Sequence, residues 1–252
     1  MPSEQTKTAE FVDTDQFRGA QIRQSDISGL EIRDCWFESR LKVVDAYGSD
    51  VYLGGEFGRV VVNDVDVTAY VTAELDRAHP NRVLAREART ADDYRATWDA
   101  IEAQWALTVE RARGLPEELL HERVDDEWSF VETLRHLLFA SDKWLGYPVL
   151  EEDSPYHPLG YGEDPTGELG LTRDAEASLD DVLEPRLARM ATMRRCVDAL
   201  ADDELDRVCA RKPIGNDQEA DYDVRHCLMV VLEEEVEHHR YAVRDLAVLA
   251  AG

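Results

Sequence analysis

Four long stretches with helical periodicity dominate the chain after residue 88, and they restrict its fold more than any other feature. In each stretch apolar side chains recur every three or four positions, which is the spacing that lines one face of an α-helix. The stretches cover residues 91–113, 128–146, 180–201 and 222–249. The connection between the second and third, residues 147–174, is long and rich in proline, glycine and aromatic residues. Four helices with one long crossover predict a helical bundle.

The N-terminal part of the chain has a different spacing. Between Phe17 and Val67 an apolar or aromatic residue recurs at every fifth position, with Lys42 as the one break. Neither a helix nor a strand has this period, whereas each face of a four-sided β-solenoid needs one inward side chain. The segment resembles the pentapeptide-repeat family, in which the position two before each central residue is small, as at Ala20 and Ser25. The resemblance implies a short solenoid of two to three coils.

These two patterns together predict an α+β protein with two domains. Residues 1–72 are expected to form the small pentapeptide-repeat β-solenoid, and residues 73–252 the four-helix bundle. Any catalytic or binding site that depends on converging helices is therefore expected in the second domain.

The charge and cysteine content restrict the partners and the compartment. The chain has 54 acidic and 28 basic side chains, a formal net charge of −26, which repels nucleic-acid phosphates and anionic membrane surfaces. No apolar run approaches the roughly 20 residues of a membrane span, and the first residues lack the order of a secretion signal. The four cysteines form no CxxC pair, which suits a reducing compartment. We therefore expect a cytoplasmic protein that binds neither nucleic acid nor membranes.

Two overlapping ligand pairs lie in "EEEVEHH", residues 233–239. Residues four apart on a helix share a face, so Glu234 pairs with His238 and Glu235 with His239. Either pair offers a carboxylate oxygen and an imidazole nitrogen to a divalent cation. The helical wheel favours Glu235 and His239, which lie near the middle of the apolar arc. Glu234 and His238 lie at its edge, from where a ligand can still face a neighbouring helix across a seam.

A third ligand is offered by His136, within "WSFVETLRHLLFASDKWL". Apolar residues surround it on most sides of the predicted helix, and an imidazole in such a place needs a polar partner. That partner is either a metal ion or a backbone carbonyl, and the spacing alone does not distinguish the two.

The segment "WSFVETLRHL", followed about a hundred residues later by "EEEVEHHRYAVRDL", resembles the DinB-like family over residues 88–250. In that family a histidine on the second helix and an H-x-x-x-H pair on the fourth bind a metal. The resemblance implies His136, Glu234 and His238 as metal ligands, with Glu235 and His239 as the alternative pair. Zinc is the first expectation for the ion. Because glutamate replaces the first family histidine and is a harder ligand, nickel or manganese, or no tightly bound metal, are left open as alternatives.

The resemblance also implies a function. Three protein ligands leave coordination positions open, as in catalytic metal sites. Similar proteins include isomerases and S-transferases that use a low-molecular-weight thiol, and others without known activity. The expectation is a metal-dependent enzyme with a small-molecule substrate, with a homodimer as a plausible assembly. The alternative is a non-catalytic binding module or scaffold that uses the acidic repeat surface for docking.

Four further residues are candidates for the surroundings of the metal. Trp144 and His157, the latter in the long connection, are candidates for the wall of a cleft over the ion. Tyr241 and Asp245 follow the histidine pair on the same helix and are candidate partners of a ligand.

Overall fold

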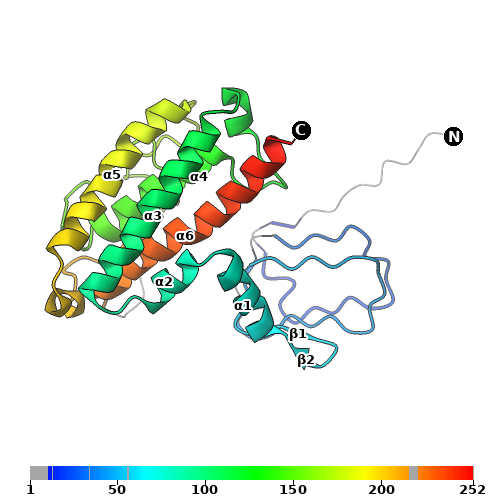
Figure 1. The fold of residues 1–252 in the computed structure, drawn as a ribbon. Helices are drawn as coiled ribbons and strands as arrows, with labels where there is room; N and C mark the ends of the chain where they lie inside the picture. The colour runs from blue at the N-terminus through cyan, green and yellow to red at the C-terminus, as the bar shows by residue number, and fades with distance from the viewer. Residues whose placement is uncertain (1–10, 13, 34, 56, 216–220, 252) are drawn as a thin grey trace. The chain divides into compact units, whose positions relative to one another are not determined.

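The four predicted long helices are all present in the computed structural model (Figure 1). They are α3 (Ala91–Ala112), α4 (Phe130–Ser141), α5 (Leu179–Ala199) and α6 (Val224–Leu249). Helix α4 continues without a break into one π-helical turn, Asp142–Gly146, and short 3₁₀ turns lie at Glu117–His121 and Asp202–Asp206. Helices α3 and α4 each pack against both α5 and α6. The helix that carries His136 therefore lies beside the helix that carries "EEEVEHH".

Each long helix begins at a side chain that caps its first turn. Thr90, Ser129 and Ser178 each accept a hydrogen bond from the backbone N–H three positions later, and the acidic side chain there accepts one from the cap residue. Asp223 accepts from the backbone N–H of His226 at the start of α6. These caps satisfy N–H groups that have no partner inside the helix, so the sequence itself sets where the helices start.

Ser129 is the cap that fixes the start of the His136 helix, and its loss is expected to be measurable. Replacing Ser129 by alanine removes the acceptor for the Glu132 N–H and should cost about 1 kcal/mol of unfolding free energy. Thermal denaturation should show a melting temperature lowered by roughly 2–4 °C. Ser129→Thr keeps the hydroxyl and should lose less; equal losses in both variants would show that the cap contributes nothing.

Apolar side chains from all four long helices form one core. The most deeply buried include Trp98, Ile101, Leu134, Leu138, Met193, Leu228 and Leu246. Burial at this depth stabilises the bundle by about 1.5–3 kcal/mol for each large side chain. The core therefore holds α4 and α6 at a fixed separation, and a site between them is built on rigid elements.

Before the bundle lie two helices and a hairpin, none of which the sequence periodicity predicted. Strands β1 (Val61–Val62) and β2 (Val65–Asp66) pair through a two-residue turn with positive φ at both central positions. Helix α1 (Thr68–Ala78) has no buried residue, while α2 (Asn81–Glu87) packs against α3 and α6. In the part of the chain that the structure describes, these two strands are the only ones, so the predicted α+β class is corrected to mainly helical.

The structure does not show the predicted β-solenoid in the described part of residues 11–60. No strand occurs among the described residues between 11 and 60. The apolar side chains expected inside it from Phe17 to Tyr52 are exposed, from 45% at Ile27 to 97% at Tyr47. One apolar residue in five, without the small neighbour that lets successive coils approach, buries too little surface to offset the conformational entropy of ordering the chain. The five-residue spacing is therefore present without the fold that it predicted.

The structure describes residues 11–251 except 13, 34, 56 and 216–220. By their internal contacts the residues fall into two units, 1–56 and 57–252, and the predicted domain boundary at 72/73 lies inside the second unit. Among the described residues no helix has the length and apolar content that crossing a membrane requires.

Candidate metal centre

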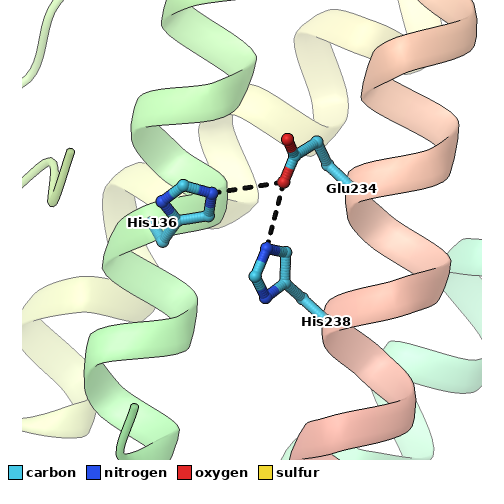
Figure 2. A group of neighbouring side chains, drawn as sticks. All are labelled: His136, Glu234 and His238. Carbon is cyan, nitrogen blue, oxygen red and sulfur yellow. Dashed lines mark hydrogen bonds and ion pairs between the residues drawn. The ribbon is translucent and has the colours of Figure 1, made fainter. Parts of the chain in front are cut away.

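His136 of α4 meets Glu234 and His238 of α6 at the seam between the two helices (Figure 2). Nε2 of His136 lies 3.2 Å from Oε2 of Glu234, and Nε2 of His238 lies 3.0 Å from the same oxygen. All three ligand atoms lie within 4.8 Å of one another. Of the two pairs that the sequence left open, the one at the edge of the apolar arc is therefore the one that faces His136.

The other nitrogen of His136 has a backbone partner. Nδ1 lies 3.1 Å from the carbonyl oxygen of Tyr161, and because a carbonyl can only accept, Nδ1 carries the proton. In the neutral imidazole the Nε2 lone pair then faces the Glu234 carboxylate, which also can only accept. Two acceptors at this distance require a cation between them, either a proton or a metal ion. The backbone contact is thus the tautomer-fixing partner typical of metal-bound histidines.

The crossover is held on α4 so that the Tyr161 carbonyl reaches His136. The Arg135 guanidinium donates to the carbonyls of four crossover residues, including Leu159 and Thr172, and the N–H of Tyr161 donates to the Arg135 carbonyl. Gly162 is required for the close approach, because a Cβ there would lie 2.2 Å from the ring of Phe139. The long connection is therefore part of the site through its backbone.

Trp128, which the sequence analysis did not single out, forms an aromatic wall beside the site. Its ring stacks on His238, with centroids 5.4 Å apart and planes 13° apart, and lies 4.5 Å from the ring of His136. The Tyr161 ring meets Trp128 edge to face. The sequence did contain a signal for this contact: an apolar residue directly before a helix cap, here Trp128 before Ser129, often packs against the first turns of the helix.

The charge state of Glu234 suits a ligand. Burial acts to raise the pKa of its carboxyl, but hydrogen bonds from His136 and His238, with their positive charge, outweigh burial and hold that pKa well below its ordinary value. The carboxylate is therefore ionised at neutral pH. An ionised oxygen beside two imidazole nitrogens is a donor set that zinc and related divalent ions accept.

The alternative pair, Glu235 and His239, is directed into the bundle instead. Nη2 of Arg186 lies 2.5 Å from both carboxylate oxygens of Glu235, and both side chains are almost fully buried. Nε2 of His239 lies 2.8 Å from the Thr108 hydroxyl, and burial lowers the pKa of His239 to about 4, so the ring is neutral. The helical wheel identified Glu235 correctly as a buried position, but the Arg186 guanidinium from α5 is paired with its carboxylate.

The four candidates for the surroundings have other partners. Trp144 packs against Tyr222 and His226, and Nδ1 of His157 accepts from the Leu159 N–H. The Tyr241 ring lies under the guanidinium groups of Arg240 and Arg244, and Asp245 is paired with Arg244. These contacts do not involve His136, Glu234 or His238, so the expectation that Trp144, His157, Tyr241 and Asp245 surround the metal stays a prediction.

The three side chains fit a divalent ion by chemistry and spacing. Tetrahedral ligands about 2.0–2.1 Å from zinc lie roughly 3.3 Å from one another, and the contacts to Glu234 are close to that separation. Glu234 and His238 remain 28% and 22% exposed, so part of each side chain is in contact with solvent. A cleft of about 800 Å³ lies nearby, bounded by Tyr161 and Arg135, and none of the three ligands lines it.

Comparison with known proteins agrees with this geometry. The family model described as the DinB superfamily matches residues 100–242, more than half of the chain, and this range contains all three side chains of the candidate site. Searches of curated proteins and of solved structures each found no match. The chain therefore belongs to the DinB superfamily.

Proposed function

We propose that this protein is a divalent-metal-dependent enzyme that acts on a small molecule, with His136, Glu234 and His238 as the metal ligands. The observation that carries the proposal is the convergence of two imidazole nitrogens on one ionised carboxylate oxygen at a helix seam. Zinc is the first expectation for the ion, with nickel or manganese as alternatives. The proposal for the reaction is S-transfer or isomerisation with a low-molecular-weight thiol.

The surroundings favour a catalytic over a structural ion. Structural zinc sites have four protein ligands and are closed, whereas this site offers three and stays open to solvent. A divalent ion held there would lower the pKa of a coordinated water or thiol toward neutrality. Trp128 covers one side of the histidine pair and restricts access by water from that direction.

Each protein group has a defined task in this proposal. The Tyr161 carbonyl holds the His136 proton on Nδ1 and keeps Nε2 directed at the site. Trp128 fixes the plane of the His238 ring by stacking. With a metal ion bound the two imidazoles would be neutral ligands, and Glu234 would supply the negative charge that they lack. Since the contacts that hold these groups come from α4, α6 and the crossover, their positions are set before a substrate binds.

The reaction class is tested with a thiol and a fluorogenic electrophile. Apoprotein prepared with a chelator and protein reloaded with zinc are compared in the conjugation of glutathione with monochlorobimane, followed by fluorescence. Reloading should raise the rate by at least about tenfold, and His136→Ala should remove the increase. A rate that is the same with and without metal for several thiols and electrophiles would overturn the thiol reaction while leaving metal binding to be measured directly.

Glu234 provides a sharper test of the ligand set. Glu234→Gln replaces the anionic oxygen by a neutral amide and should weaken zinc binding by about 100-fold, measured by competition with a chromophoric chelator. Glu234→His restores the nitrogen that the family pattern has at this position and should keep tight binding. Glu233→Gln, one residue earlier on the exposed face, is the control and should bind as the parent does. Unchanged affinity in Glu234→Gln would exclude this carboxylate as a ligand.

A further inference from the structure

A pair of cysteines lies at the N-terminal end of α6, before the candidate metal ligands in the sequence. The sulfur atoms of Cys209 and Cys227 are 4.0 Å apart. Cys227 lies in the first turns of α6 and is fully buried, while Cys209 precedes the helix and retains 8% exposure. Both thiols are free, and two buried thiols in contact are a feature that the metal site does not use.

Backbone hydrogen bonds hold the two cysteines together. Val208 and Asp223 form an antiparallel bridge, and the N–H of Cys209 donates to the Tyr222 carbonyl at 2.8 Å. The N–H of Val224 donates to the Arg207 carbonyl at 3.0 Å. The segment before α6 is thus fastened on both sides of the thiol pair. A disulfide needs a sulfur separation of about 2.05 Å, so the two sulfurs must approach by about 2 Å from their present 4.0 Å while this bridge holds the backbones beside them in place.

The environment gives the two thiols different reactivity. The S–H of Cys227 donates to the Cys209 sulfur and lowers the pKa of Cys209; burial opposes this, and the Arg207 guanidinium adds to it. The same hydrogen bond, together with burial, raises the pKa of Cys227. Of the two sulfurs, Cys209 has the lowered pKa and the greater exposure, 8% against 0% for Cys227, so it is the one that more readily becomes a nucleophilic thiolate. Cys196, by contrast, has its pKa raised to about 11 by burial.

From this geometry we infer that Cys209 and Cys227 are a redox-active dithiol that a small hydroperoxide converts into an intramolecular disulfide. The Cys209 thiolate attacks the peroxide oxygen, giving a sulfenic acid and releasing hydroxide. Cys227 loses its proton and attacks the Cys209 sulfur, forming the disulfide and expelling the sulfenic oxygen as water. With hydrogen peroxide the balance is two thiols and one peroxide to one disulfide and two waters.

The disulfide would close the loop of residues 210–226 and join the preceding segment to α6. Cys227 stands seven positions before Glu234, so it lies on the same stripe of α6 as the candidate ligands. Cross-linking a loop of this length restricts the unfolded chain and stabilises the fold. The oxidised protein would hold this end of α6 more firmly, whether or not a metal is bound.

Peptide mapping of the full-length protein tests the inference without any variant. The metal-free protein is treated with hydrogen peroxide, denatured, alkylated and digested without reductant. The expected product is a peptide pair joining Cys209 and Cys227 with the loss of two hydrogen atoms, while Cys196 remains alkylated. Alkylation of both Cys209 and Cys227, at a peroxide concentration that oxidises the exposed Cys35, would overturn the inference.

Two variants identify the order of the steps. In Cys227→Ser the resolving thiol is absent, so a sulfenic acid should accumulate on Cys209 and be trapped by dimedone. The matched control, Cys196→Ser, should form the disulfide as the parent does. Dimedone on Cys227 in Cys209→Ser, with none on Cys209 in Cys227→Ser, would contradict the assignment of roles. Because no metal takes part, these results are independent of the proposed enzymatic function.

Discussion

Replacing His136 and His238 together by alanine is expected to reduce bound divalent metal from nearly one ion per chain to a trace. The two imidazoles supply two of the three ligand atoms, and Glu234 alone cannot retain the ion. We expect the affinity for zinc to fall more than about a thousandfold, since each lost ligand removes several kcal/mol of binding free energy. Elemental analysis of the untagged protein after exhaustive dialysis measures this directly.

The control for the double variant is His121→Ala, which removes an exposed histidine paired only with Glu117 among the described residues. Its metal content should equal that of the parent. Circular dichroism establishes whether the double variant is folded; if it is not, the single variant His238→Ala, on the more exposed ligand, takes its place. A folded double variant that keeps the parent's metal content would show that the ion binds elsewhere.

Replacing Arg186 by alanine is expected to destabilise the bundle strongly. Arg186 and Glu235 are 2% and 1% exposed, and the substitution leaves the Glu235 carboxylate buried without its counter-ion. Breaking a buried ion pair by removing one partner costs about 3–5 kcal/mol. For a unit of this size the melting temperature should fall by roughly 6–20 °C, measured by calorimetry. Arg195→Ala, an exposed position on the same helix, is the control and should change it little.

The double variant Arg186→Met, Glu235→Leu distinguishes charge from packing in this pair. It removes both charges and keeps apolar volume, so most of the lost stability should return. Nε and Nη1 of Arg186 have no hydrogen-bond partner among the described residues, so the native pair already carries a desolvation cost that the apolar pair avoids. If the double variant is as unstable as Arg186→Ala, the loss comes from packing and not from the unpaired carboxylate.

The bundle could be predicted from the sequence because its signals are local. Capping residues such as Thr90, Ser129 and Ser178 fix where the helices start, and apolar residues at helical spacing fix which faces are buried. Helix α1 was not predicted because it lacks these local signals. It buries no residue in the structure and no side chain caps its first turn, so it lacks the capping signal that marks the start of the long helices.

The choice between the two ligand pairs could not be made from α6 alone. The wheel ranks positions by burial, and Glu235 is indeed the most buried carboxylate on the helix. What decides its role is Arg186, which lies on another helix and whose position across the core no local pattern reveals. Glu234 was predicted correctly as the residue that faces His136 only through the family resemblance.

The five-residue spacing misled for a different reason. A repeat of apolar residues predicts a solenoid only if successive coils bury them against one another. In the structure Phe17 and Tyr52 are among the exposed large side chains. Period alone therefore does not establish the fold of this segment, and we assign no function to it.

The central claim, a divalent ion held by His136, Glu234 and His238, is tested most directly by anomalous diffraction from crystals grown with zinc. Data collected on both sides of the zinc absorption edge should give one strong peak between α4 and α6, about 2.0–2.2 Å from Nε2 of both histidines and from a carboxylate oxygen of Glu234. If zinc is present in the crystal but no peak appears there, and the imidazoles remain hydrogen-bonded to Glu234, the three residues are an ionic cluster and the claim is wrong.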